Sequence, residues 1–376
     1  MKREFKKTKK FLIVFSSFIF ILVITTFAYM QQPKFGASPS EDTLKIRKKS
    51  TNFRDGKFQN QTITPTFAEG YSFWGEIRKE LFERYPRTVP LDVIPSVKSD
   101  LKHLSEKDNV IVWFGHSSCF IKLNGKTILI DPVLSGSASP VPWSVKSFKG
   151  TDIYTVDDLP AIDYLLISHD HYDHLDYETV KALEKKTKHV ICGLGVGAHF
   201  ERWGYAKDKL IEKDWNEKVT IDSALSIYTF PSRHKSGRGL KQDRTLWISY
   251  LIEATAMKIY YSGDGGYDTR FAAIGKQFGP IDIAIVENGQ YDEAWHYIHM
   301  LPGETLKAAS DLKAKRVFPV HNSKFKLARH PWDEPLKKIT ELNEQYHFPL
   351  ITPMIGEVVN LNDSLQVFKQ WWKDIK

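Results

Sequence analysis

The stretch SHDHYDHLD, residues 168–176, constrains the fold more than any other part of the chain. It holds three histidines and three aspartates within nine residues, directly after the apolar run IDYLLIS. Polar groups at this density are costly to bury without a partner, and imidazole together with carboxylate suits zinc, iron or manganese ions. A single metal ion rarely takes four ligands from one short segment. The stretch therefore predicts two metal ions, and a fold that supplies further ligands, with four ligands here: His169, His171, Asp173 and His174.

Further ligand-type residues follow other strand-like runs. YTFPSRH ends at His234, KIYYSGD ends at Asp264, and RVFPVH ends at His321. A carboxylate can span two metals about 3.5–4 Å apart, which makes Asp264 the expected bridge. The expected cofactors are two Zn²⁺, with Mn²⁺ or Fe²⁺ also suited to these side chains. The remaining residues divide into two sets: His169, His171 and His234 for one ion, and Asp173, His174 and His321 for the other.

Apolar strand-like runs alternate with helical segments along the rest of the chain. The runs include NVIVWFG, CFIKLNGKTILIDP with an Asn-Gly hairpin turn, LWISYLIE and IDIAIVENG. The segment YETVKALEKK is expected to form a helix capped by Asp176. This pattern predicts an α/β fold in which two β-rich sheets pack together and helices cover them outside. Cys119 and Cys192 lie in apolar runs, so both are expected to be buried free thiols.

Three segments outside this alternation carry exposed or amphipathic residues. FWGEIRKELFERYPR, residues 73–87, predicts a helix that docks on the domain. The loop Val133–Phe148 carries Trp143 and Phe148 as exposed aromatic residues, and either dips into lipid or packs as a surface loop. The segment LQVFKQWWKDIK near the C-terminus predicts an amphipathic strand or helix.

The N-terminus combines a basic decapeptide with a long apolar run. Six basic residues and one glutamate in residues 1–10 contribute +5 of the formal charge of +8, which leaves +3 for the rest. That remainder is small for a surface that follows phosphates, so no nucleic-acid partner is expected. Residues 11–30, FLIVFSSFIFILVITTFAYM, contain no charge, glycine or proline. Twenty helical residues rise about 30 Å, enough to cross the hydrocarbon core of a bilayer.

The basic flank predicts a single-pass anchor in the cell membrane, with the bulk of the chain outside the cytoplasm. A cleaved signal peptide is the alternative, but the apolar run is longer than usual and FAYM is a poor cleavage site. The expected organisation is a basic cytoplasmic flank at 1–10, a transmembrane anchor at 11–30, a polar tether at 31–65 and a catalytic domain at 66–376.

The motif HDHYDHLD, with His234, Asp264 and His321 in the later positions, resembles the signature of the metallo-β-lactamase fold. Longer segments are similar to one branch, N-acyl-phosphatidylethanolamine-hydrolysing phospholipase D and its bacterial relatives. They include VWFGHSSCFIKLNGKTILIDPVLSGSASP, PAIDYLLISHDHYDHLD and YYSGDGGYDTRFAAIGKQFGPIDIAIVENGQY, and the similarity covers roughly 109–335. The resemblance implies a four-layer αββα sandwich and a dinuclear zinc site held by the seven residues named above.

The same resemblance implies roles for residues around the metals. His299 matches a histidine that contacts substrate phosphate, and Asp173, Asp264 and His299 are the expected catalytic residues. Gln290 and Tyr267 lie in matched segments and are expected to contact substrate together with His299. Gly115 and His116 match a turn beside the site, and Asp131 matches a position from which a carboxylate orients a ligand imidazole. Lys235 and Gln290 depart from the family pattern, which puts an acyl-ethanolamine substrate in doubt.

The expected activity is phospholipase D-like hydrolysis of a phosphodiester by a hydroxide that bridges the metals. A membrane anchor favours a membrane lipid or a wall polymer as the substrate, because tethering raises the local concentration. A lactonase or another hydrolase of carbonyl substrates is the alternative enzyme, since the same nucleophile would attack carbon. A non-catalytic, membrane-tethered binding module is a third hypothesis. The sequence predicts no particular oligomeric state.

Overall fold

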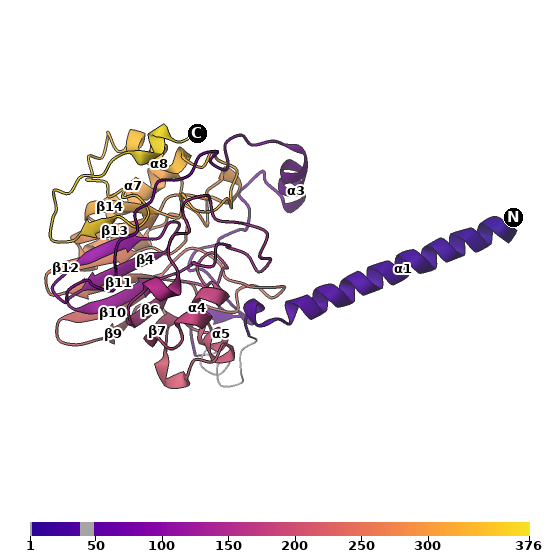
Figure 1. The fold of residues 1–376 in the computed structure, drawn as a ribbon, viewed down its shortest axis with the longest axis horizontal. Coiled ribbons are helices and arrows are strands. Elements are labelled where there is room, and N and C mark those ends of the chain that lie inside the picture. The colour runs from indigo at the N-terminus through magenta and orange to yellow at the C-terminus, as the bar shows by residue number, and fades with distance from the viewer. Residues whose placement is uncertain (1, 38–48) are drawn as a thin grey trace.

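Two β-sheets stacked face to face form the centre of the protein in the computed structural model, which describes residues 2–37 and 49–376 (Figure 1). The first sheet comes mainly from the N-terminal half and has the order β15-β3-β4-β5-β6-β7-β8. Its strands are β3 (Val110–Trp113), β4 (Cys119–Leu123), β5 (Lys126–Ile130), β6 (Ile162–Ile167), β7 (Thr187–Gly193), β8 (Leu210–Lys213) and β15 (Val358–Asn360).

The second sheet follows in the chain and has the order β14-β13-β12-β11-β10-β9. A separate two-stranded hairpin, β1 (Phe53–Arg54) and β2 (Lys57–Phe58), precedes both sheets. The strands of the second sheet are β9 (Glu217–Thr220), β10 (Leu225–Pro231), β11 (Ile248–Ala254), β12 (Met257–Tyr261), β13 (Ile281–Glu287) and β14 (Ala314–Val320).

Alternate residues of a central strand enter different layers of the core. In β3, Ile111 packs in the cluster between the two sheets, whereas Val112 packs in the cluster on the outer face. Side chains of a strand point alternately to its two faces, so a strand buried on both sides must be apolar throughout. Helices cover both outer faces, which confirms the expected αββα sandwich. They are α4 (Tyr177–Leu183), α5 (Gly197–Arg202), α6 (Arg270–Phe278), α7 (Pro302–Asp311) and α8 (Glu334–Leu342).

Several local predictions agree with the structure. Asn124 and Gly125 form the turn between β4 and β5 with φ of 50° and 73°, the positive values that a two-residue hairpin turn requires. Asp176 caps α4 by accepting a hydrogen bond from the backbone N–H of Glu178. Cys119 and Cys192 are both buried and free.

The helix α1 (Lys2–Met30) projects from the domain as a single straight element (Figure 1). An 18-residue window within Phe5–Met30 has a mean hydropathy of 2.6, none of that window is buried, and the helix is long and apolar enough to cross a membrane. The segment expected to be a tether lies partly outside the described residues, at 38–48. Its described parts pack on the domain: Trp203 donates a hydrogen bond to the carbonyl of Pro33, and Asn60 bonds the backbone of His234.

Three features differ from the sequence predictions. The predicted docking helix forms as α3 (Phe73–Phe82), but its large apolar side chains face solvent instead of the domain. Phe148 is only 5% exposed, so of the two aromatic residues in that loop Trp143 alone faces outward. The C-terminal segment forms a short 3-10 helix, Trp371–Asp374, whose two tryptophans are buried.

Candidate metal centre

The predicted ligands follow strands that end at one edge of the core. In the first sheet β6 runs parallel to β5, and in the second sheet β12, β13 and β14 run parallel to one another. Two successive antiparallel pairings relate β10 to β12, so these strands also share a direction. Residues that follow the carboxyl ends of such strands meet at the same edge. The residues gathered there include all seven predicted ligands: His169, His171, Asp173, His174, His234, Asp264 and His321.

The first group of ligand atoms comprises three imidazoles, from His169, His171 and His234, whose ligand atoms lie within 4.8 Å of one another. Nε2 of His169 is 2.8 Å and Nε2 of His234 is 3.2 Å from Nδ1 of His171. Nδ1 of His234 lies 3.0 Å from the carbonyl oxygen of Ile298, to which it donates in the tautomer that leaves Nε2 for the cluster. Three converging nitrogens of this kind fit one metal ion.

The second group contains Asp173, His174 and His321 and, in addition, His116. Nε2 of His321 is buried and has no hydrogen-bond partner among the described residues, and Nε2 of His174 meets the carboxylates of Asp264 and Asp173 at 3.0 and 3.4 Å. Burying an imidazole nitrogen without a partner is costly, and a cation at this position would remove the cost. The residues present therefore fit a second metal ion.

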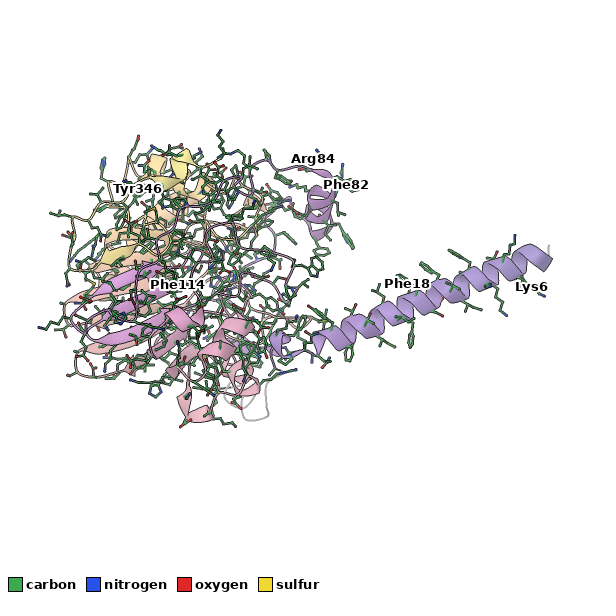
Figure 2. The ribbon with its side chains drawn as sticks, viewed as in Figure 1. Lys6, Phe18, Phe82, Arg84, Phe114 and Tyr346 are labelled. Carbon is green, nitrogen blue, oxygen red and sulfur yellow. The ribbon has the colours of Figure 1, made fainter. Side chains whose placement is uncertain are left out.

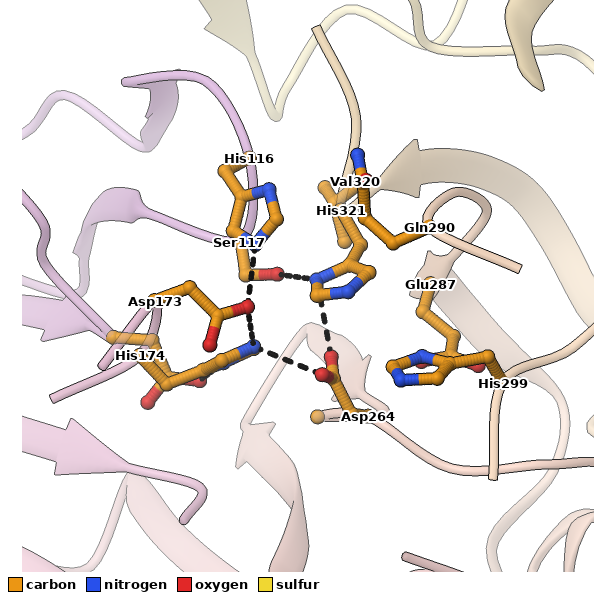
Figure 3. A network of polar contacts seen from close by, with 12 residues as sticks. His116, Ser117, Asp173, His174, Asp264, Glu287, Gln290, His299, Val320 and His321 are labelled. Carbon is orange, nitrogen blue, oxygen red and sulfur yellow. Dashed lines mark hydrogen bonds and ion pairs between the residues drawn. The ribbon is translucent and has the colours of Figure 1, made fainter. Parts of the chain in front are cut away.

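Asp264 lies between the two groups, as Figure 3 shows for its contacts with the second. Its Oδ2 is 3.0 Å from Nε2 of His174 and 3.8 Å from Nε2 of His234. Its Oδ1 is 3.2 Å from Nδ1 of His321. This Oδ1 accepts no hydrogen bond from any described residue. One carboxylate thus reaches both groups, which is the geometry that a shared ligand requires.

Burial affects the two groups differently. It lowers the pKa of His171 to about 4 and holds the pKa values of His169 and His234 well below 6.5. These imidazoles are neutral at pH 7, the form that binds metals. Burial raises the pKa of Asp264 to about 7, whereas for His174 the nearby Asp264 and Asp173 overcome burial and raise the pKa well above 6.5. Without a cation, the second group therefore retains protons that a metal ion would displace.

Asp131 orients His174 from behind. It follows β5 and accepts hydrogen bonds from Nδ1 of His174 at 2.8 Å, from the hydroxyl of Tyr261 at 2.7 Å and from the backbone N–H of Ser168 at 2.8 Å. The bond to Nδ1 fixes the tautomer and directs Nε2 toward Asp264. The orienting position predicted for Asp131 agrees with these contacts.

His299 and Glu287 lie across Asp264 from Asp173 and His174 (Figure 3). Nδ1 of His299 is 3.3 Å from a carboxylate oxygen of Glu287. Glu287 also accepts hydrogen bonds from the backbone N–H groups of Met300 and Gly265, and burial raises its pKa to about 8. The Glu287 carboxyl therefore holds His299 in place beside the cluster.

Sequence reasoning missed Glu287 and placed His116 only in a neighbouring turn. In the structure Nε2 of His116 is 2.9 Å from Oδ2 of Asp173. Glu287 ends β13, and His116 closely follows β3, which two antiparallel pairings relate to β5. Both residues obey the strand-end pattern that identified the ligands, so the same signal could have found them.

A cavity of about 280 Å³ opens over the cluster. Lys235 and Gln290 line it, but the side-chain amide of Gln290 is engaged by the backbone of Phe325, Leu327 and Ala328. Gln290 thus braces the rim of the cavity. Tyr267 does not line the cavity, and its hydroxyl donates to Asp311 at 2.6 Å, so the structure does not bring this predicted substrate contact to the site. The remaining lining residues are Thr66, Phe67, His171, Asp173, Asp264, Trp295, Ile298, His299, His321 and Leu327.

Comparison with known proteins agrees with this architecture. Residues 126–322 match the beta-lactamase superfamily domain. An uncharacterized protein of Mycobacterium tuberculosis is 34% identical over 332 residues, which cover 87% of this chain and 89% of the relative. The chain belongs to the beta-lactamase superfamily and is a hydrolase of the metallo-β-lactamase fold.

Two further relatives place the chain within this fold. The N-acyl-phosphatidylethanolamine-hydrolyzing phospholipase D 1 of Caenorhabditis elegans is 28% identical over 281 residues, 69% of this chain and 78% of that protein. A metallo hydrolase from Ignicoccus hospitalis superposes with a TM-score of 0.53 at 19% identity, over 67% of this chain and 98% of that one. The chain is therefore related to the N-acyl-phosphatidylethanolamine-hydrolysing enzymes, and the solved structure supports its fold.

Proposed function

We propose that this protein is a membrane-anchored phosphodiesterase that uses two metal ions and acts on a phospholipid or a related membrane or wall compound. The observation that carries the proposal is the carboxylate of Asp264, shared between two groups of ligand atoms beneath an open cavity. The same cavity presents Lys235 and His299, two side chains suited to an anionic substrate.

In this proposal His169, His171 and His234 hold one ion, and Asp173, His174 and His321 hold the other. Asp264 reaches both. Zinc fits a site so rich in imidazole, and manganese or iron shares the same ligand types. When bound, two such ions supply Lewis acidity and lower the pKa of a water molecule enough for attack near neutral pH.

Side chains of the chain itself would bind and orient the phosphate. Burial raises the pKa of Glu287 to about 8, so its carboxyl can donate to Nδ1 of His299, and the Nε2–H of His299 is then available to donate to a phosphate oxygen. The ammonium group of Lys235 at the cavity wall complements the negative charge of a phosphodiester. Attack by water forms one P–O bond and breaks the bond to the leaving alcohol, so the products are a phosphate monoester and an alcohol.

The apolar helix α1 supports the membrane setting. Its apolar part is long enough to span a bilayer, and the basic residues at its start favour a cytoplasmic N-terminus. The catalytic domain then lies outside the cytoplasm, next to outer-leaflet lipids and wall polymers. The C. elegans relative is named for hydrolysis of a phospholipid, which also favours a lipid phosphodiester.

The test is incubation of the full-length protein with a panel of membrane lipids, followed by mass spectrometry of the products and elemental analysis of the protein. We expect about two metal ions per chain and products in which a phosphodiester has become a monoester. Release of a carboxylic acid without any phosphate monoester would indicate a carbonyl hydrolase instead. Retained lipid binding with no metal and no turnover would indicate a binding module.

The variant His299→Ala examines the phosphate contact. It should keep both metal ions and lose turnover mainly through a higher KM for the phosphodiester. The matched control is His103→Ala, because His103 is an exposed histidine outside the cavity. Unchanged kinetics in His299→Ala would remove the main reason for preferring a phosphate substrate.

Protease treatment of intact cells tests the topology. With a tag at each end, shaving should remove the C-terminal tag and spare the N-terminal one. Survival of the C-terminal tag until lysis would place the domain in the cytoplasm and exclude outer-leaflet and wall substrates.

A further inference from the structure

The helix α3 attaches to the domain by its polar side and turns its apolar side outward. Trp74 and Phe82 are 75% and 79% exposed, and Phe73 and Leu81 are exposed as well. Figure 2 shows α3 with Phe82 labelled, standing away from the domain. A surface helix ordinarily does the opposite and buries its apolar stripe. We call these four residues the aromatic face of α3.

A buried ion pair fixes this orientation. Glu76 lies on the opposite side of α3 and pairs with Arg329, which also pairs with Asp292 at 2.8 Å. Lys79 binds the other oxygen of Glu76 at 3.0 Å, and Ser72 caps the helix by accepting from the backbone N–H of Gly75. The polar contacts are thus satisfied on the domain side, so α3 cannot bury its apolar side there without breaking them.

We propose that the aromatic face of α3 lies in the interfacial layer of the same bilayer that α1 enters. Clustered exposed aromatic and aliphatic side chains mark an interaction surface. Tryptophan and phenylalanine are favoured at the boundary between lipid headgroups and acyl chains.

The position of α3 relative to α1 supports lipid as the occupant. Both helices stand on the same side of the domain (Figure 1). Besides the residues of α3, Trp143 is also exposed, by 82%. Its loop lies against the base of α1, because the hydroxyl of Tyr29 donates a hydrogen bond to the carbonyl of Pro140 at 2.8 Å. The base of α1, this loop and α3 thus form a face directed toward the bilayer.

The composition of α3 also fits a lipid surface. Phe73 and Ile77 also line the cleft between α3 and the domain, whereas Trp74, Leu81 and Phe82 are exposed and lie outside that cleft. Arg78 of α3 and Arg84 just after it are exposed, and the exposed Glu80 and Glu83 balance their charge. The helix itself carries two acidic and two basic residues, so its fit to a membrane interface rests on its exposed tryptophan, phenylalanine and leucine and not on net charge.

The aromatic face lies next to a path that leads to the metal centre. The use of this path by a lipid substrate rests on the proposed function. Phe67, Trp295 and Leu327 line both the cavity over the cluster and the cleft between α3 and the domain. A lipid that leaves the bilayer along α3 would pass these three apolar side chains before its phosphate met the cluster.

The test uses full-length protein reconstituted in vesicles of phosphatidylcholine and phosphatidylglycerol. Both native cysteines are buried, so an environment-sensitive fluorophore can be placed on Trp74→Cys or Trp143→Cys alone. The matched control is Val367→Cys, an exposed apolar position in the C-terminal segment, which lies apart from α1 in Figure 1. Lipids with a quencher near the headgroup should lower the emission at positions 74 and 143 about twofold or more and leave position 367 unchanged.

The outcomes separate the possible occupants of the face. Quenching at 74 with a blue-shifted emission supports lipid contact. A solvent-like emission at 74 without quenching by lipid would overturn the proposal. A blue shift that depends on protein density and not on the quencher would identify a second copy of the chain instead. The readout does not use turnover, so it remains valid even if the phosphodiesterase proposal fails.

Discussion

The metal-site cluster and the aromatic face of α3 both place side chains against their usual preference, in opposite directions. Around Asp264, imidazoles and carboxylates are buried. On α3, tryptophan and phenylalanine are exposed. In each case the side chains suit a partner that the chain does not itself provide: metal ions in the first, and a bilayer in the second.

The two regions differ in how firmly the chain holds them. The cluster is assembled from loops after many strands, and carboxylates behind it, such as Asp131 and Glu287, fix the rings. The orientation of α3 depends largely on one buried ion pair, Glu76 with Arg329. A substitution that breaks the ion pair should therefore reorient α3. A substitution of one ligand in the cluster should remove metal ions without changing the arrangement of the strands.

The largest effect should come from Asp264→Ala, which removes the only carboxylate that reaches both groups among the described residues. We expect loss of one or both metal ions and a fall in turnover of about 1000-fold or more. Elemental analysis and lipid turnover measure this, with Asp208→Ala at an exposed position as the control. Two retained ions would show that the carboxylate is not shared.

Asp131→Asn should have a smaller effect, because it keeps the shape but removes the charge behind His174. Metal affinity should fall about 10–100-fold, the usual cost of losing such an orienting carboxylate. Competition with a chelator measures the affinity, and an unchanged value would mean that packing alone orients the ring.

The pH dependence of metal binding should distinguish the two groups of ligands. His174, whose pKa is raised by Asp264 and Asp173, holds a proton in the metal-free protein near neutrality, and this proton must leave when a metal binds at the second group. Asp264 is shared, so its own protonation affects both groups. Affinity at the second group should therefore fall about tenfold per pH unit below the raised pKa of His174, because one proton is displaced there. The first group should hold its ion to lower pH, because His171 protonates only at a pKa of about 4. Dialysis at successive pH values with elemental analysis should show stepwise loss, and simultaneous loss would contradict the assignment.

Arg329→Met should release α3 by leaving Glu76 buried without its partner. The cost should be up to about 3 kcal/mol, seen as faster hydrogen exchange in 73–82 while the sheets stay protected. Lys326→Met is the control, because Lys326 meets α3 only through a more exposed pair with Glu80. Equal exchange in both variants would mean that other contacts orient the helix.

The smallest effect should come from Trp74→Ser in detergent. An exposed residue contributes little to folding, so the free energy of unfolding should change by no more than about 0.5 kcal/mol. By contrast, Ile121→Ala between the sheets should cost about 2–5 kcal/mol. A large loss of stability in Trp74→Ser would indicate that the aromatic face is packed against protein.

The cluster was predictable because each ligand can be recognised from the few residues around it in the sequence. A ligand residue that directly follows an apolar run can be recognised in the sequence, and parallel strands then bring such residues together. The orientation of α3 was not predictable in this way, because the partner of Glu76 is Arg329, 253 positions away. The helical pattern identified an apolar side correctly, but only the distant ion pair determines which way that side faces. Phe148 was misjudged for a similar reason: its backbone N–H is bonded to the carbonyl of Lys324, far along the chain.

The close attachment of α1 to the domain has a consequence for how far the enzyme can reach. Tyr29 bonds the carbonyl of Pro140, and Arg202 bonds the carbonyls of Gln31 and Gly36, so the base of α1 is fastened as soon as it leaves its apolar stretch. With α1 in a bilayer, the catalytic domain would stay at a fixed distance from the membrane surface. No long flexible linker would let it move away from that surface. Such an enzyme would meet its substrates by drifting sideways in the plane of the membrane, which favours lipids of its own leaflet over polymer strands farther out in the wall.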